Sequence, residues 1–223
     1  MVDEERKINV NTADRITLFK LIQHVTSRPE DAIKELVEGI VNWREIHSTE
    51  MVGFASDDYY ATLPQPYPVK HAPFELLDEL RLIKGMDQEL YEALRPFVTV
   101  YGDGLINVNT APREVLVGLG LSVELADRFL GARRGLDGKD ATDDDHMFQQ
   151  AFDVTKEVQQ IITLEKEEII AIDFLNAAGK IKTSSMYYLI RSTADLPGMP
   201  APLAIECIYN VRNNVIEYWK EKI

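Results

Sequence analysis

The hexapeptide INVNTA occurs twice in this chain of 223 residues, at residues 8–13 and again at residues 106–111. The residues that follow the two copies also correspond at the same offset. The matching pairs are Arg15 with Arg113, Leu18 with Leu116, and Leu21 with Leu119. An identical run of six residues is very improbable by chance in a chain of this length, so the repeat indicates two related structural modules.

Each copy of the hexapeptide predicts a short strand followed by an amphipathic helix. The isoleucine and valine of the hexapeptide alternate with its two asparagines, as in an extended segment. Asn11 or Thr12 is expected to cap the first helix, because a side-chain oxygen there can accept hydrogen bonds from free N–H groups of the first turn. In the second copy, Pro112 is expected as an early helical residue.

Apolar residues at helical spacing predict further helices between the two copies and after the second. The expected ranges are 31–46, 75–83, 87–94, 122–135, 155–162 and 166–178. Residues 47–74 contain four prolines and no helical period, which predicts a long loop. After Gly179 the pattern changes to a period of two. It predicts antiparallel strands at 186–196, 202–211 and 215–220, with a hairpin turn at 212–214.

Composition and charge exclude several classes of protein. The 24 Lys and Arg residues against 37 Asp and Glu residues give a formal net charge of −13. This balance argues against a nucleic acid or an anionic membrane surface as partner, because phosphates attract basic proteins. Cys207 is the single cysteine and excludes an internal disulfide. No apolar run approaches the roughly 18 residues of a membrane span.

The motifs of common enzyme classes are missing from the sequence. There is no HExxH, GxSxG or phosphate-binding Walker loop, and the four histidines do not have metal-ligand spacing. We find no pair of nucleophile and base. The chain is therefore expected not to be an enzyme and not to act on a small-molecule substrate.

Several longer segments have residues similar to those of one known family and occur in the same order. The most distinctive is PYPVKHAPFELLDELRLIKGM at residues 66–86. The others are DEERKINVNTAD, IVNWRE, LYEALRPFVTVYGDGLINVNTAPREVL and YYLIRSTADL. Together they span nearly the whole chain and resemble the K-type minor pseudopilins of the type II (general) secretion pathway.

The resemblance implies an α+β fold, in which a pilin-like antiparallel sheet carries a large inserted helical domain of the SAM-like or helix-hairpin-helix-like kind. Residues 1–12 would be the end of a pilin-like strand that leads into the insert. Residues 13–179 would form the helical insert, and residues 180–223 the C-terminal antiparallel strands. The strands need a cover for their apolar face, which an N-terminal hydrophobic helix missing from this sequence would supply.

The resemblance also implies function and location. The protein would be a non-enzymatic minor pseudopilin at the tip of the type II secretion pseudopilus, on the periplasmic face of the bacterial inner membrane. Its N-terminal helix would be anchored in that membrane. It would assemble with the I- and J-type minor pseudopilins to initiate or cap the pseudopilus for protein export across the outer membrane.

The family is further associated with calcium in a loop of the helical domain. In this chain the Trp and Tyr-Tyr landmarks of that loop are Trp43 and Tyr59–Tyr60. The acidic run and the Gly-Ala-Glu that usually lie between them are altered. The acids available as calcium ligands are Glu45, Glu50, Asp57 and Asp58. Calcium takes about 6–8 oxygen ligands, several of them from carboxylates, and these four acids could supply some of the ligands of the calcium site that the resemblance implies.

Three other features have competing interpretations. The segment LVGLGLSVELA at 116–126 resembles half of a helix-hairpin-helix, which would make the protein a periplasmic nucleic-acid receptor of a competence-like system. That function requires a contiguous basic face near residues 118–134. The acidic loop at 136–146 lacks EF-hand spacing and is expected to be a solvated loop. The aromatic residues Trp43, Tyr59, Tyr60 and Tyr67 either pin the long loop to the helices or form a partner-binding patch.

Overall fold

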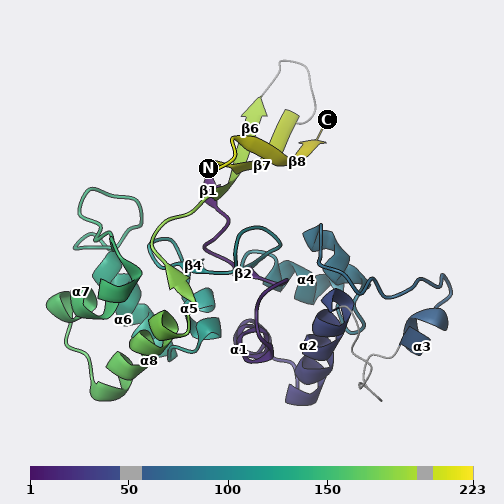
Figure 1. The fold of residues 1–223 in the computed structure, drawn as a ribbon, viewed down its shortest axis with the longest axis horizontal. Helices are drawn as coiled ribbons and strands as arrows, with labels where there is room; N and C mark the ends of the chain where they lie inside the picture. Colours follow the sequence, from purple (N-terminus) through teal and green to yellow (C-terminus); the bar gives the residue numbers. More distant parts are fainter. Residues whose placement is uncertain (46–56, 195–202, 223) are drawn as a thin grey trace.

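A four-stranded sheet stands at one end of a larger block of helices in the computed structural model, which describes residues 1–45, 57–194 and 203–222 (Figure 1). The strands are β1 (Val2–Asp3), β2 (Ile8–Asn9), β3 (Val98–Thr99), β4 (Ile106–Asn107), β5 (Ile181–Lys182), β6 (Tyr187–Ala194), β7 (Leu203–Asn210) and β8 (Val215–Lys222). The α-helices are α1 (Arg15–Val25), α2 (Glu30–Arg44), α3 (Asp57–Ala61), α4 (Gln88–Leu94), α5 (Arg113–Leu119), α6 (Val123–Arg133), α7 (Val154–Ile161) and α8 (Lys166–Ala177). The 3-10 helices are η1 (Leu77–Leu82) and η2 (Ala151–Asp153).

The large sheet has the strand order β1-β6-β7-β8, and all its neighbours are antiparallel. β1 pairs with β6 through Val2 opposite Leu189, although the two strands lie far apart in the sequence. The chain therefore leaves the sheet after β1, forms the helical block, and returns to the same sheet at β6. The expected α+β class with an antiparallel sheet is confirmed.

The three strands expected after Gly179 are confirmed as β6, β7 and β8. β7 and β8 are joined by a tight turn over residues 211–214, in which Asn214 has a positive φ of 55°. Asn tolerates this left-handed conformation better than most residues, which is why the Asn-rich turn was predictable. A bulge between Ile208 and Tyr209 shifts the register along β8.

The helical block consists of two modules, each closed by a short parallel strand pair. In the first module, residues 4–103, β2 pairs with β3; in the second, residues 104–183, β4 pairs with β5. The first module lies on the right in Figure 1 and the second on the left, and helices α1 and α5 pack together between them. Gly118 allows this close packing, because a Cβ there would stand 3.0 Å from Ile8 and 3.1 Å from Leu21.

Apolar periodicity correctly predicted α2, α4, α6, α7 and α8, because each buries one face in the shared core. Two segments differ from the prediction. Within the range 75–83 the chain forms the 3-10 helix η1 and not an α-helix. The buried Leu80 lies three residues before the buried Ile83 that ends it, which fits the three residues per turn of a 3-10 helix. The predicted loop 47–74 contains helix α3, whose five residues are too few to show a helical period.

The predicted helix caps were wrong in both modules. α1 begins after Asp14, whose carboxylate accepts a hydrogen bond of 2.7 Å from the N–H of Thr17. Asn11 and Thr12 lie in a turn before that cap. Pro112 occupies the N-cap position of α5 and not a helical one. Within the described residues, no helix is long and apolar enough to span a membrane.

Two helical glycines provide a matched test of the packing. A Cβ on Gly39 in α2 would stand 2.8 Å from Cγ2 of buried Ile83, whereas a Cβ on Gly131 in α6 would meet no atom within 4 Å. We expect Gly131→Ala to raise the free energy of unfolding by up to about 1 kcal/mol, because Ala has the higher helix propensity. Gly39→Ala should lower it by about 1–2 kcal/mol through overpacking. Urea unfolding measures both, and equal effects would contradict the close approach of α2 to Ile83.

Candidate functional site

The second asparagine of each INVNTA copy forms two hydrogen bonds with a distant backbone segment, and we call this pair of bonds the clasp. In the first module, Asn11 donates from Nδ2 to the carbonyl of Phe74 at 3.0 Å and accepts from the N–H of Phe74 at 2.7 Å. In the second module, Asn109 makes the same two bonds with Phe148, both at 2.9 Å. One carboxamide thus satisfies both backbone groups of a single residue, as a neighbouring strand would.

The first asparagine of each copy holds the turn that places the clasp. Oδ1 of Asn9 accepts from the N–H of Asn11 at 2.8 Å, and Oδ1 of Asn107 accepts from the N–H of Asn109 at 3.1 Å. Asparagine favours such local turns because its side chain imitates a backbone carbonyl. The asparagines of the repeat are therefore used in the protein's own hydrogen bonds, which include those from Asn107 to Asp3 and Ser185. The repeat is a structural motif and not a ligand-binding one.

One arginine from the second long helix of each module completes the turn. Arg44 donates to the carbonyls of Val10 and Ala13, and Arg133 donates to Val108 at 3.0 Å and Ala111 at 2.8 Å. Sequence reasoning missed both arginines, because the spacing between them differs from the spacing between the hexapeptides.

The two arginines differ in their charge partners. Arg133, with a side chain that is 3% exposed, pairs with Asp140 at 2.7 Å, and Arg134 bonds the other oxygen of the same carboxylate at 2.9 Å. Hydrogen bonds from Arg134 and Arg133, together with their positive charges, hold the pKa of Asp140 at about 2, below its ordinary 3.8, although partial burial opposes the shift. Within the described part of the chain, Arg44 has no ion pair of this kind.

Three consecutive carboxylates are buried where the chain passes from the sheet into the helical block. Their partners are Asn107, Thr110 and Ser185 for Asp3, Lys7 and Thr99 for Glu4, and Lys182 and Met186 for Glu5. The composition alone gave no signal for this cluster, because a run of acids near a terminus usually lies on the surface. The cluster ties both modules and the returning strand to one point.

The aromatic residues around the long loop pack on one another. Trp43 contacts Tyr60 and Tyr67 edge to face, and its ring stacks on Phe74 at a centroid distance of 6.4 Å. The Tyr67 hydroxyl donates to the carbonyl of Leu82 at 2.8 Å. The interpretation that these aromatics pin the loop to the helices is therefore confirmed, and Trp43 and Tyr60 are buried.

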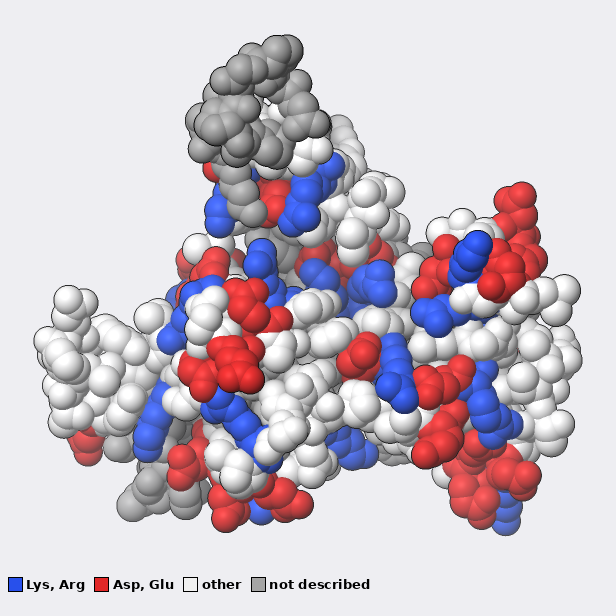
Figure 2. Space-filling model, turned by 180° about the vertical axis from the view of Figure 1, so that it is seen from behind, with Lys and Arg blue, Asp and Glu red and all other residues white. Residues whose placement is uncertain are grey.

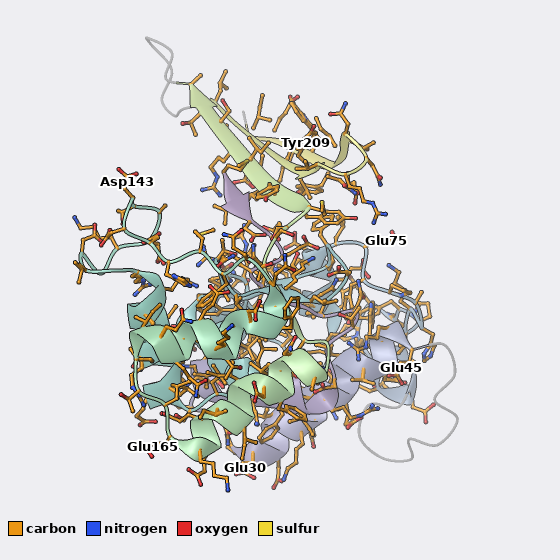
Figure 3. All side chains as sticks on the ribbon, turned by 60° about the vertical axis from the view of Figure 1, so that its left-hand side comes forward. Glu30, Glu45, Glu75, Asp143, Glu165 and Tyr209 are labelled. Carbon is orange, nitrogen blue, oxygen red and sulfur yellow. The ribbon has the colours of Figure 1, made fainter. Side chains whose placement is uncertain are left out.

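The four candidate calcium ligands lie within residues 45–58, and the structure describes only the two ends of this segment. Glu45 follows α2 and lies 4.0 Å from Arg15, and Asp58 lies exposed in α3. Glu50 and the side chain of Asp57 lie outside the described residues. Among the described side chains, no group of three or more His, Cys, Asp or Glu residues could hold a metal ion. Figure 3 shows Glu45 and Asp143 on opposite sides of the block, so the two acidic regions are separate.

The acidic loop at 136–146 binds its own backbone. Asp144 accepts from the N–H groups of Leu136 and Asp137, and Asp145 accepts from those of Ala141 and Thr142. These bonds use the carboxylates to hold the turns of the loop.

The hairpin between α5 and α6 does not offer a phosphate site. The N–H groups of Gly120 and Leu121 donate to the carbonyls of Val117 and Leu116. The three arginines of α6 and its C-terminal end also form ion pairs. Arg128 pairs with Glu168 at 2.5 Å, and Arg133 and Arg134 both pair with Asp140. On the face drawn in Figure 2, basic and acidic residues are interspersed. The basic face that a nucleic-acid receptor requires is not formed by these residues, so that alternative is not supported.

The two faces of the large sheet have different neighbours. Residues paired across antiparallel strands share a face, so Cys207 lies with Ile190 of β6 and Trp219 of β8. Leu203, Ile205, Tyr209 and Ile216 lie on the same face, as the alternation in β7 predicted. The exposed side chains of this face include Ile216 and Trp219, the latter 50% exposed. We call it the apolar sheet face.

The opposite face of the sheet borders a cleft against the first module. Ile208 and Tyr218 line the cleft from the sheet, and Leu76 and Tyr91 line it from the block. Nearby, burial raises the pKa of Tyr101 to about 12. Since the block already adjoins this side, the apolar sheet face is the side of the sheet open to another element.

Comparisons with known proteins agree with these observations. Residues 3–103 match the family described as type II secretion system (T2SS), protein K. A type II secretion system protein K of Pectobacterium carotovorum subsp. carotovorum is 30% identical over 111 residues, covering 49% of this chain and 34% of the relative. One from Klebsiella pneumoniae is 29% identical over 90 residues, covering 40% and 27%. The matches thus span about a third of these curated relatives' length.

A solved structure has the same fold. It is the crystal structure of the GspK–GspI–GspJ complex from the type 2 secretion system of enterotoxigenic Escherichia coli, which matches with a TM-score of 0.72 and 14% identity. The match covers 100% of this chain and 78% of that chain. The resemblance to the protein K family is confirmed for residues 3–103, and the solved structure shares the fold of both modules and the sheet.

The ion pair at Asp140 predicts a defined pH dependence. Its carboxyl has a lower pKa folded than unfolded, so the stability that it contributes is complete above about pH 4 and is lost as the pH falls through about 2. Asp140→Asn should lower the free energy of unfolding at pH 7 by about 1–2 kcal/mol, a value reduced because the carboxylate is half exposed. It should also flatten the loss of stability between pH 4 and pH 2.

Urea unfolding at pH 7 and at pH 2.5–4 measures both effects. The matched control is Asp143→Asn, an exposed acid of the same loop, which should change neither. An unchanged acid transition in Asp140→Asn would contradict the role of Asp140 as counter-ion of Arg133.

Proposed function

We propose that this chain, whose residues 3–103 match the protein K family of the type II secretion system, acts as a non-enzymatic minor pseudopilin at the tip of the pseudopilus. The observation that most strongly supports this proposal is the match in fold, over the full length of this chain, to the crystal structure of a GspK–GspI–GspJ complex. The I- and J-type minor pseudopilins are the partners that we propose here. The assembly would initiate or cap the pseudopilus for protein export across the outer membrane.

The shape of the molecule supports a tip position. The helical block is inserted between β1 and β6, so it lies beyond one end of the sheet and is wider than the sheet (Figure 1). If the sheet side contacts the pseudopilus, the block occupies the place where a further subunit would be added. A subunit of this shape can be added first but leaves no room above itself.

The finer description of the fold is part of this proposal. We take the large sheet to be pilin-like and the block to be a SAM-like, helix-hairpin-helix-like insert. The proposed limits are 1–12 for the entering strand, 13–179 for the insert and 180–223 for the closing strands. The repeated module and the neighbouring positions of β1 and β6 support this division.

The apolar sheet face supports the proposed attachment to the inner membrane. A sheet needs a cover over its apolar face, and the described residues place the helical block on the other side. We propose that this face packs an N-terminal hydrophobic helix, which anchors the protein on the periplasmic side of the inner membrane.

The assembly is tested with the purified periplasmic parts of the I- and J-type proteins of the same secretion system. Size-exclusion chromatography with light scattering should detect a complex that contains all three chains. A chain that stays monomeric with both partners, together and singly, would overturn the proposal.

The sheet contact is tested in the complete protein, in a strain that lacks its own copy. Trp219→Lys places a charge on the apolar sheet face and should strongly reduce secretion. The control Phe174→Lys changes a side chain of α8 that is also exposed, at 63%, and should leave secretion unchanged. Equal secretion by both variants at equal protein levels would contradict the role of this face.

We also propose that calcium binds in the first module through Glu45, Glu50, Asp57 and Asp58. Glu45 and Asp57–Asp58 stand at the two ends of one segment, so folding can bring carboxylates from both ends to one ion. The described side chains alone do not complete a metal site. When bound, calcium would join the two ends of the segment and stabilise the fold.

Calcium binding is tested by thermal melting after treatment with a chelator. A ligand that binds only the folded state stabilises it by about 2.7 kcal/mol at 100 times its dissociation constant. The melting temperature should therefore rise with calcium and not with magnesium. Asp58→Asn should reduce the rise, and Asp143→Asn in the distant acidic loop should not. No rise in the unchanged protein would refute the calcium site but not the role in assembly.

A further inference from the structure

The exposed side of α1 borders a groove in the first module. The groove runs between α1 and α2, and its apolar surface comes from Ile16, Phe19 and Val37. Val37 is buried and Phe19 is partly buried, whereas the side chain of Ile16 is 68% exposed. We call this surface the α1–α2 groove.

The groove is not explained by the packing of α1. The helix buries Leu18 and Leu21 against the core, whereas Ile16 and Phe19 lie three residues apart on its outer side. An exposed isoleucine at this position contributes little to the core. A contiguous apolar surface of this kind often marks an interaction site.

The internal repeat provides a comparison within the same chain. At the offset of the two hexapeptides, the core residue Leu18 corresponds to Leu116, so both modules keep the same residue there. The groove residue Ile16 corresponds instead to Glu114, and Lys20 corresponds to Gly118. The module fold therefore does not require an isoleucine or a lysine at these two positions. Ile16 and Lys20 are therefore specific to the groove of the first module.

The edges of the groove are basic in a strongly acidic protein. Arg15, Lys20 and Lys34 line it, although the chain carries a net charge of −13. Lys20 has no ion pair with any described residue. Lys34 makes only exposed pairs of 3.5 and 3.7 Å, which contribute little to stability and exchange easily. Glu38, the acidic residue of the lining, is neutralised by Arg15 at 3.0 Å.

The same side of α1 continues towards the second module. Lys20 and Gln23 also border a second hollow, which Gly120 and Leu121 of the α5–α6 hairpin complete. The hollowed surface thus extends along two turns of α1 as far as the α5–α6 hairpin of the second module. This length suits a helical or extended segment better than a small molecule.

We propose that the α1–α2 groove binds an acidic amphipathic segment of a partner protein. Apolar side chains of the segment would cover Ile16 and Phe19, and its Asp or Glu residues would pair with Lys20 and Lys34. This is the helix-in-groove mode of recognition, with charge complementarity at the edges. The proposal does not depend on the role in the pseudopilus. An anionic membrane is the less favoured occupant, because the rest of this acidic chain would be repelled by it.

The test uses a labelled helical peptide of about 16 residues, with Leu at positions i, i+3, i+4 and i+7 and Glu elsewhere. Fluorescence anisotropy with the 223-residue chain should give saturable binding that weakens as salt is raised. A matched peptide with Lys in place of Glu should not bind. Equal binding of both peptides would overturn the proposal, as would binding to phosphatidylglycerol vesicles but not to the acidic peptide.

Matched variants locate the binding site. Ile16→Glu should weaken binding by at least about tenfold, whereas Ile170→Glu, which changes a similarly exposed isoleucine of α8, should not. Lys20→Glu should weaken binding and reduce its salt dependence, whereas Lys166→Glu should do neither. All four side chains are exposed, so the melting temperatures should stay unchanged. If Ile16→Glu and Ile170→Glu have the same effect, the site is not the α1–α2 groove.

Discussion

The three buried carboxylates of residues 3–5 decide how the sheet and the two modules are joined. Burying a charge costs several kcal/mol unless partners and hydrogen bonds offset the loss of hydration. The acids meet this requirement with partners from both modules. Glu4 bonds Thr99 of the first module, whereas Asp3 bonds Asn107 and Glu5 bonds Lys182, which lie opposite each other in the second module. The hydrogen bonds of all three acids are complete only when the sheet and both modules are in place, so these bonds link the folding of the sheet to that of the block.

The same principle operates inside each module, where one asparagine satisfies both backbone groups of a distant phenylalanine. The partner of Asn11 lies 63 residues away, and that of Asn109 lies 39 residues away. The clasp therefore fixes the position of a connecting segment without fixing its length. This explains how the first module can contain a long insertion between α2 and η1 while it keeps the same internal motif as the second.

The sequence could predict the features that depend on residues close together in the chain, but not those that depend on hydrogen bonds between distant residues. Helices such as α2 and α6 were predictable because their apolar positions repeat every three or four residues. The repeated hexapeptide predicted the two modules because the same residues recur at one offset. The role of its asparagines was not predictable, since an Asn before a helix more often caps that helix, and the partners that engage Asn11 and Asn109 are remote in sequence. Arg133 and its partner Asp140 were missed because an arginine in an amphipathic helix usually lies on the surface.

The two modules also indicate where function can lie. Positions that serve the module fold are the same in both copies, as with the clasping asparagines and the arginine that closes each turn. Positions that differ are free of that constraint. The second module neutralises its arginine with Asp140, which allows deeper burial, whereas the first exposes an apolar and basic groove along α1. If both copies had kept the same surface, the block would present two equivalent sites on opposite modules. Because the two modules differ at positions such as Ile16 and Glu114, the block presents different surfaces to its surroundings.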